Sequence, residues 1–325
     1  MLISEKVPSP RRETIRFASG DSFCGAWLYT PTNTSSGRPL PVVVMGHGMG
    51  ATREMGLEPF AKRFAAEGIA VVAFTYRNFG DSGGTARQLV SVTSQLEDWE
   101  SALSFVSSDA RFDSTRIGIW GTSFGGGHAI TVASRHPELR AAVAQCPFTD
   151  GTASAGVSDF STTVAMMARV GLDQLARFGA RGSTLPIAAA PGHMALMNTP
   201  DALNGYQGLI PADFHWTNHV AARSLPNIIR YRPGRSAKKI AIPILFCVST
   251  TDSVAPPEKT LHYAEQAPHG DIKTYTAGHF DFYLGSAQQQ LATDQAAFLR
   301  KFLLGEDTAE ERAEVRTKSN GGRQQ

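Results

Sequence analysis

The stretch Gly121-Thr122-Ser123-Phe124-Gly125-Gly126 decides the fold. It follows the short apolar run Ile117-Gly118-Ile119-Trp120 and opens a helix-compatible stretch that continues to His136. A strand, a sharp turn and a helix around G-x-S-x-G are the setting of a nucleophile elbow, in which glycines permit a strained and crowded turn. The pattern predicts that the Ser123 hydroxyl stands above the end of a sheet. Taken alone, the pentapeptide also fits a Gly-rich turn capped by serine.

The composition is that of a globular protein without a large charged face. Of 325 residues, 42% are hydrophobic and 18% are charged, and the formal net charge is +2. Nucleic-acid binding would require a strongly basic face, and a membrane span would require about 20 consecutive apolar residues. The N-terminal segment also has no apolar run of signal-peptide length. We therefore expect a cytoplasmic protein that binds neither nucleic acid nor membrane.

The cysteines do not indicate a metal or redox site. Cys24, Cys146 and Cys247 lie far apart in separate apolar runs, which favours buried, reduced thiols. No cluster of Cys and His has the spacing of metal ligands. We expect neither a metal nor a cofactor.

Short β-rich runs alternate with longer helical patterns along most of the chain. This alternation predicts an α/β protein with a mostly parallel sheet of eight strands and helices on both faces. The expected strands cover residues 14–18, 23–29, 42–46, 70–75, 117–121, 141–146, 242–248 and 272–275. The expected helices cover residues 57–67, 92–107, 124–136, 257–266 and 287–304.

One long insertion interrupts the alternation. Residues 1–150 and 236–304 are expected to form the core, and residues 151–235 an inserted cap. A connection of this length needs its own secondary structure, and apolar residues recur at helical spacing in 164–178 and 220–229, so the cap should be mostly helical. The polar segment 305–325 is expected to be disordered.

A Gly-rich loop follows the expected strand 42–46. In Gly46-His47-Gly48-Met49-Gly50, backbone N–H groups can point at a developing oxyanion. The residue after the nucleophile supplies the second donor in such sites, so Met49 and Phe124 are the expected oxyanion pair. His47 is a candidate for substrate contact. A plain strand-to-helix loop is the alternative interpretation.

An acid and a base follow the last two expected strands. Asp252 lies after the strand 242–248, and His279 lies after the strand 272–275. A histidine in this position can take the Ser123 proton through one ring nitrogen while a carboxylate holds the other. Asp150, at the end of the strand 141–146, is an alternative acid.

The cap is rich in residues suited to an apolar and adaptable acyl pocket. Phe214, His215 and Trp216 are candidate substrate contacts, although packing within the cap is the interpretation that their composition favours. Further apolar candidates in the cap are Met166, Met167, Met194, Leu196 and Met197.

Four segments carry a resemblance to the α/β-hydrolase superfamily, which covers about residues 16–304. They are HGMGATREM (47–55), AFTYRNFGDSGG (73–84), WGTSFGGGH (120–128) and AQCPFTDG (144–151). They look closest to the branch of dienelactone-hydrolase-like and peptidase-S15-like hydrolases, which includes fungal polyketide-pathway acyltransferases and thiohydrolases. The resemblance implies an α/β-hydrolase fold and a triad of Ser123, Asp252 and His279 in the superfamily's chain order.

A serine nucleophile with a histidine base attacks acyl carbons. We therefore expect a serine hydrolase of small carboxylic esters or thioesters. An acyltransferase that moves a polyketide-type or other acyl group to an alcohol or amine is one alternative, and a non-catalytic ligand-binding homologue is another. A CoA or carrier-protein thioester would require cations near the pocket, and the candidate is the basic run Arg230, Arg232, Arg235, Lys238 and Lys239. Such a run is more commonly a solvated linker. The oligomeric state stays open.

Overall fold

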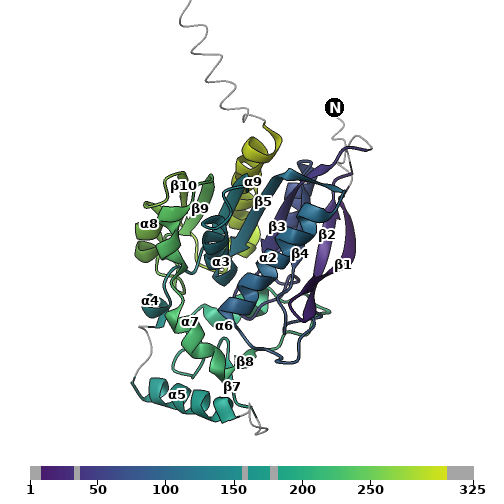
Figure 1. Cartoon of the computed structure of the whole chain (residues 1–325). Helices are drawn as coiled ribbons and strands as arrows, with labels where there is room; N and C mark the ends of the chain where they lie inside the picture. The colour runs from purple at the N-terminus through teal and green to yellow at the C-terminus, as the bar shows by residue number, and fades with distance from the viewer. Residues whose placement is uncertain (1–8, 33–36, 156–159, 176–181, 306–325) are drawn as a thin grey trace, which may run out of the picture.

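The apolar runs of the sequence form the strands of one eight-stranded sheet (Figure 1). The structure is a computed structural model that describes residues 9–32, 37–155, 160–175 and 182–305. The order across the sheet is β1 (Arg11–Ser19), β2 (Ser22–Thr30), β4 (Ala70–Phe74), β3 (Leu40–Gly46), β5 (Phe112–Thr122), β6 (Ala141–Gln145), β9 (Ile244–Ser249) and β10 (Gly270–Tyr275). The strand β2 pairs antiparallel with β1 and β4, and all other neighbouring strands of this sheet pair in parallel. The predicted eight-stranded, mostly parallel sheet is confirmed.

Helices cover both faces of the sheet, as a parallel sheet requires. On one face, α1 (Glu58–Ala66) packs against α9 (Gly285–Leu304), and on the other α2 (Val92–Ser108) packs beside α3 (Phe124–Ala133). Figure 1 shows α2 in front of the sheet and α9 behind it. The helix α8 (Pro257–Ala264) packs on β9. The predicted helices agree with these within a few residues.

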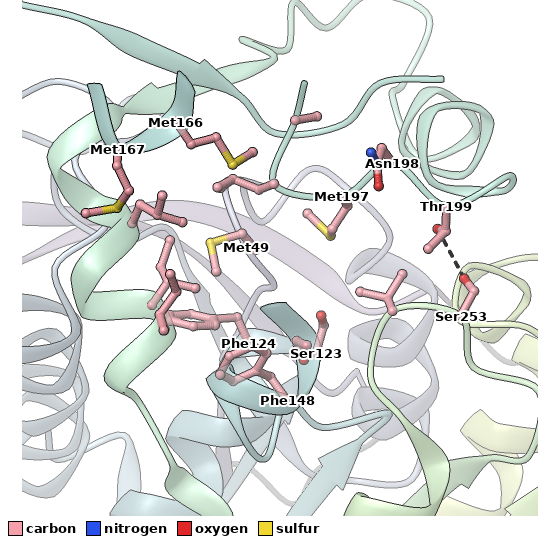
Figure 2. Close-up of a pocket in the computed structure, with 18 residues that line it drawn as sticks. Met49, Ser123, Phe124, Phe148, Met166, Met167, Met197, Asn198, Thr199 and Ser253 are labelled. Carbon is pink, nitrogen blue, oxygen red and sulfur yellow. Dashed lines mark hydrogen bonds between the residues drawn. The ribbon is translucent and has the colours of Figure 1, made fainter. Parts of the chain in front are cut away.

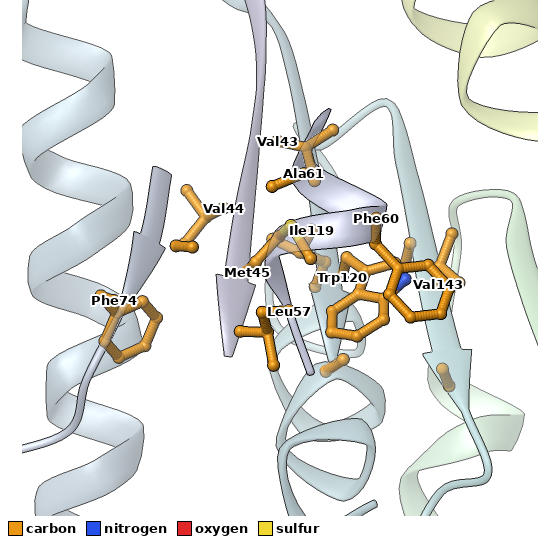
Figure 3. Close-up of a cluster of buried hydrophobic side chains, with 14 of the residues drawn as sticks. Val43, Val44, Met45, Leu57, Phe60, Ala61, Phe74, Ile119, Trp120 and Val143 are labelled. Carbon is orange, nitrogen blue, oxygen red and sulfur yellow. The ribbon is translucent and has the colours of Figure 1, made fainter. Parts of the chain in front are cut away.

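The central strands are apolar on both sides, and they form the core with α1 and α9. Figure 3 shows β3, β5 and α1 contributing side chains to one cluster. Trp120 lies 5.2 Å from the Phe60 ring, and its indole N–H donates to Gln295 in α9 at 2.8 Å. Because the indole is fully buried and its N–H is paired, truncating Trp120 should cost about 3–5 kcal/mol.

Residues 151–235, here called the cap, lie between β6 and β9. The cap contains α4 (Gly151–Ala155), α5 (Phe160–Leu175), β7 (Thr184–Pro186), α6 (Ala202–Gly208), β8 (His219–Ala221), α7 (Leu225–Arg230) and the 3-10 helix η2 (Ala222–Ser224). A second 3-10 helix, η3 (Pro233–Lys239), begins in the cap and ends in the core. The antiparallel pair of β7 and β8 was not expected. Strands of three residues are too short to show an alternating pattern in the sequence. For this reason residues 220–229 were expected to be one helix, whereas the helix begins only at Leu225.

Three further expectations concern the cysteines, the C-terminal tail and membrane spans. The three cysteines are buried and unbridged, as expected. The tail 306–325 lies outside the described residues. Within the described part of the chain, no helix is long and apolar enough to cross a membrane.

Candidate active site

Ser123 occupies a strained turn between β5 and α3. Its backbone has φ +53° and ψ −119°, a conformation that non-glycine residues rarely adopt. A β-carbon at Gly121 would collide with the Gly125 backbone, and one at Gly125 would collide with the carbonyl oxygen of His47. These glycines therefore allow the sharp turn that lifts the Ser123 side chain above the end of the sheet.

The structure brings Ser123, His279 and Asp252 together from three loops at the carboxyl ends of β5, β10 and β9. His279 Nε2 lies 3.1 Å from Ser123 Oγ, and His279 Nδ1 lies 2.7 Å from Asp252 Oδ2. The other carboxylate oxygen accepts the backbone N–H groups of Val254 and Ala255 at 2.8 and 2.7 Å. With Asp252 held in this way, Nδ1 carries the hydrogen and Nε2 is free to accept the serine proton.

The surroundings of His279 favour its charged form. Burial alone would lower the pKa of His279, but the adjacent Asp252 carboxylate, with a smaller contribution from Cys146, raises it well above its ordinary value. Attraction between the imidazolium and Asp252 at 2.7 Å is the physical cause. An imidazolium formed during a reaction would be stabilised in the same way.

Asp150, the alternative acid, has a different position. Its Oδ1 accepts the backbone N–H of Thr152 at 3.0 Å and the Thr152 hydroxyl at 2.6 Å. Its Oδ2 accepts the Tyr263 hydroxyl at 3.1 Å. Asp150 therefore anchors the start of α4, and Asp252 is the carboxylate beside His279.

The expected oxyanion pair, Met49 and Phe124, lines the same pocket as Ser123. Phe124 is the first residue of α3, so its N–H belongs to the helix-terminal amides that lack an intrahelical partner. Met49 lies in the loop after β3 and lines the same pocket as Ser123. That the N–H groups of Met49 and Phe124 stabilise a developing oxyanion stays a prediction.

His47 lies beneath this loop and does not line the pocket at Ser123, so its predicted substrate contact stays a prediction without support from the lining. Only 1% of its surface is exposed. Its Nδ1 donates to the Gly48 carbonyl at 2.9 Å, and its Nε2 accepts the Tyr76 N–H at 3.3 Å. Burial lowers the pKa of His47 to about 4, so the ring is neutral and both nitrogens keep these roles near pH 7.

Two cap residues bind the same loop from above, and sequence reasoning missed the first of them. The Tyr206 hydroxyl donates to the Met49 carbonyl at 2.7 Å, and the Trp216 indole N–H donates to the Gly50 carbonyl at 2.9 Å. The two rings stack with centroids 4.9 Å apart and an interplanar angle of 4°. Nothing in the sequence around Tyr206 signals this contact, because its partner is 157 positions away.

The start of α6 also contacts the loops that carry the acid and the base. Asp201 Oδ1 accepts the Ser253 hydroxyl at 2.6 Å, next to Asp252. Tyr206 packs against the Phe280 ring, next to His279, with centroids 5.3 Å apart. The segment Asp201–Tyr206 therefore touches the loops of the oxyanion donor, the acid and the base together.

A pocket with a volume of about 140 Å³ opens at Ser123 (Figure 2). Most of its lining is apolar, including Met49, Phe124, Phe148, Met166, Met167, Leu196, Met197, Leu225, Ile228 and Ile229. Besides Ser123, its polar side chains are Ser154, Asn198, Thr199 and Ser253, and the last three are here called the polar wall. The pocket therefore lies between the core and the cap, with Ser123 at its base.

Phe214, His215 and Trp216 do not line this pocket, contrary to the prediction. They line a separate hollow of about 650 Å³ together with Gly50, Thr52 and Asp81. The Trp216 indole is bound to Gly50 and stacked on Tyr206. Aromatic composition alone could not indicate which of the two hollows these residues line.

The basic run also lies outside the pocket. None of its five residues lines the cavity at Ser123, and Arg232 lies 3.7 Å from Asp150. Contact of this run with the phosphates of CoA stays a prediction. Within the described residues, no group of three or more His, Cys, Asp or Glu could hold a metal ion.

The sheet, the elbow and the Ser, Asp, His order define an α/β-hydrolase. Comparison with known families agrees and is more specific. The chain belongs to the family described as serine aminopeptidase, S33 (Hydrolase_4), whose model matches residues 37–280. It is therefore an enzyme of the hydrolase or acyltransferase type.

Individual relatives cover nearly the whole chain. The quorum-quenching protein AidA of Acinetobacter baumannii is 46% identical over 89% of this chain and 94% of its own length. The thiohydrolase aneE of Aspergillus aculeatus is 27% identical over 82% of this chain and 86% of its own length. Among solved structures, the α/β hydrolase GrgF from Penicillium superposes with a TM-score of 0.75 at 21% identity, covering 90% of this chain and 99% of GrgF.

Proposed function

We propose that this protein hydrolyses carboxylic esters or thioesters of small apolar acyl groups through an acyl-enzyme on Ser123. The observation that carries the proposal is the hydrogen-bonded series Ser123, His279, Asp252, with distances of 3.1 and 2.7 Å. A non-catalytic homologue would not need to keep this alignment. The serine hydrolase family of the chain supports the same reaction type.

The reaction begins when His279 Nε2 takes the proton of the Ser123 hydroxyl. Ser123 Oγ forms a bond to the acyl carbon, and the carbonyl electron pair moves to oxygen, where the N–H groups of Met49 and Phe124 stabilise the charge. Collapse of this intermediate breaks the bond to the leaving oxygen or sulfur, which receives the proton from His279. Water then repeats the sequence on the acyl-enzyme and releases the carboxylic acid.

The size of the pocket limits the acyl group. The volume of about 140 Å³ is close to that of cavities that accommodate benzene, about 150 Å³. An acyl group of about six heavy atoms therefore fits without rearrangement. Met166 and Met167 on α5 are unbranched and flexible, so they tolerate variation in the shape of the chain.

The lining does not favour a peptidase that recognises a free amino terminus. Such a substrate carries an ammonium group, which a buried site has to pair with a carboxylate. Among the described residues that line the pocket, none is Asp or Glu. An acyl ester or thioester suits this lining better than a peptide.

A second candidate function comes from AidA, at 46% identity. Quorum signals with an acyl group and an ester-type bond, such as acylated lactones, would place the chain in a quorum-quenching role. This role uses the same triad and differs only in the leaving group. Loss of reporter-strain response to an acylated lactone after incubation with the protein would test it, with Ser123→Ala as the control.

The decisive experiment combines covalent labelling with a substrate panel. A fluorophosphonate should add to Ser123 in the intact protein, as detected by mass spectrometry, and labelling should vanish in Ser123→Ala. Turnover of p-nitrophenyl esters, acyl thioesters and acyl lactones should fall by about 10⁴–10⁶ in the same variant. Addition of alcohol acceptors to each reaction separates hydrolysis from acyl transfer by product analysis. Persistent labelling of Ser123→Ala would contradict the proposal.

A further inference from the structure

The pocket at Ser123 has one polar wall, formed by Asn198, Thr199 and Ser253. Asn198 and Thr199 precede α6 and are half-buried, whereas Ser253 follows Asp252 and is exposed. The polar wall therefore lies at the solvent side of a largely apolar pocket. A few polar groups in such a lining fix the orientation of a ligand.

The two hydroxyl groups of this wall already donate their hydrogens. Thr199 Oγ1 donates to Asp201 Oδ1 at 2.8 Å, and Ser253 Oγ donates to the same oxygen at 2.6 Å. A carboxylate only accepts, so the direction of both bonds is fixed. A longer contact of 3.3 Å joins the two hydroxyls (Figure 2). Each hydroxyl has a single hydrogen and therefore presents lone pairs to the pocket.

Asn198 adds a third acceptor. Its side-chain N–H donates to the His193 carbonyl at 3.1 Å, which fixes the orientation of the amide because a carbonyl cannot donate. The amide oxygen consequently points the other way, and Figure 2 shows it on the side of the pocket where Ser123 lies. The wall as a whole is thus complementary to hydrogen-bond donors.

The wall stands on the side of Ser123 where a leaving group must depart. His279 has to protonate the leaving atom, so the leaving group lies next to the His279 loop. Ser253 adjoins Asp252, and Asp201 lies 4.0 Å from the β-carbon position of Gly278, the neighbour of His279. The methionines of α5 lie on the opposite side of Ser123 in Figure 2, where the acyl chain has apolar contacts.

We infer that the leaving group of the natural substrate carries an N–H or O–H donor that binds the wall of Asn198, Thr199 and Ser253. This inference rests on the proposed hydrolase function and adds the chemistry of the departing half of the substrate. An alcohol or thiol with a secondary amide two carbons from the leaving atom has such a donor. Simple alkyl alcohols lack it, although they fill the same space.

Paired substrates that differ in one group test the inference. Butanoyl esters of N-acetylethanolamine and of 5-hydroxypentan-2-one differ only in an N–H replaced by a methylene. The corresponding butanoyl thioesters form a second pair. Comparison of the two pairs distinguishes an ester from a thioester as the natural substrate. The quantity of interest is the ratio of kcat/KM within each pair, because it cancels effects on the shared acyl step.

The ratio should favour the N–H substrate about three- to tenfold in the wild type, which corresponds to one net hydrogen bond. The double variant Asn198→Leu with Thr199→Val should bring the ratio near one. The matched double variant Asn198→Asp with Thr199→Ser keeps acceptors at both positions and should keep the preference. Gln207→Ala, at an exposed position of α6, should also keep it. A wild-type ratio near one, or a ratio insensitive to the first double variant, would overturn the inference.

Binding to the Ser123→Ala protein separates this inference from the proposed function. Ligand-observed NMR with N-acetylethanolamine and 5-hydroxypentan-2-one reports on the wall without turnover. A preference for the amide in this measurement, with no Ser123-dependent hydrolysis, would refute the proposed function and support the wall as a donor site. Equal binding of both alcohols, together with a wild-type kcat/KM ratio near one, would refute the inference that the wall binds a donor. It would leave the proposed hydrolase function untouched.

Discussion

The hydroxyl of Tyr206 in the cap donates to the carbonyl of Met49 at 2.7 Å, across 157 positions of sequence. Met49 supplies one of the two expected oxyanion donors, so a cap residue restrains the peptide geometry of the core loop. The bond is buried, where a hydrogen bond holds geometry more firmly than it does in water. The cap therefore binds the loop that carries Met49 and also lines the pocket at Ser123.

Tyr206→Phe should lower kcat about tenfold with a smaller change in KM. The variant keeps the ring that stacks on Trp216 and loses the bond to Met49, together with a weak contact of 3.9 Å to the Met197 sulfur. The oxyanion donor should then be less well ordered in the transition state. Steady-state kinetics on a p-nitrophenyl ester would measure both constants. Tyr263→Phe is a matched control, because its lost bond is to Asp150 at the start of α4. Equal losses in the two variants would indicate general destabilisation instead.

Asp252→Asn should reduce activity far more than Asp150→Asn. The first change removes the carboxylate that fixes the His279 tautomer, and a comparable change in serine proteases costs about 10⁴ in kcat. The second loosens the start of α4 and leaves the His279 hydrogen bonds intact. Activity of both purified variants at one pH would decide. The reverse order would assign the acid to the end of β6.

The pH dependence of kcat/KM should show an ascending limb above pH 6.5. The Asp252 carboxylate holds the pKa of His279 well above its ordinary value of 6.5, and the ring accepts the Ser123 proton only after it has lost its own. Activity therefore rises as pH increases through that pKa. Asp252→Asn should move the limb to lower pH, because the neutral amide no longer stabilises the imidazolium. A wild-type limb below pH 6.5 would contradict this account.

Acidification from pH 6.5 to 4 should weaken the fold in part through His47. Burial lowers the pKa of His47 to about 4 in the folded state, so the unfolded chain binds a proton in this range that the folded chain does not. The free energy of unfolding then falls with pH, by at most about 3 kcal/mol at about 1.4 kcal/mol per unit of pKa shift. Urea titrations should show a shallower dependence for His47→Asn. The exposed His193→Asn should follow the wild type.

Met166→Ala should shift the preferred acyl chain to greater length by about two or three carbons. Met166 is 6% exposed and lines the pocket, so its truncation enlarges the acyl end. The cost in stability should be about 2–5 kcal/mol, as for other large-to-small changes in a core. Met194→Ala is the matched control, because Met194 packs on the same α5 cluster without lining the pocket. The kcat/KM profile over p-nitrophenyl esters from C2 to C10 would show the shift.

The sequence predicts the core and the triad positions better than it predicts the cap. Strands with continuous apolar residues and the G-x-S-x-G turn are local signals, and they place Ser123 and His279 at the same edge of the sheet. The contacts of Tyr206 and Asp201 depend on how the cap lies on the core, which no local pattern encodes. Trp216 shows the same limit, because it binds the Gly50 carbonyl and lines a hollow separate from the pocket at Ser123.

The cap leaves the sheet after β6 and returns at β9, and these two strands are hydrogen-bonded neighbours. The two ends of the insertion therefore emerge close together, and a longer or shorter insertion would change the loop-closure entropy only logarithmically. Evolution can exchange such a segment for another without reordering the strands. Because Tyr206 and Asp201 hold the oxyanion and acid loops, however, a replacement cap would also have to supply these two tethers. A change of cap that alters the substrate pocket would thus also alter the contacts to the loops that carry Met49 and Asp252.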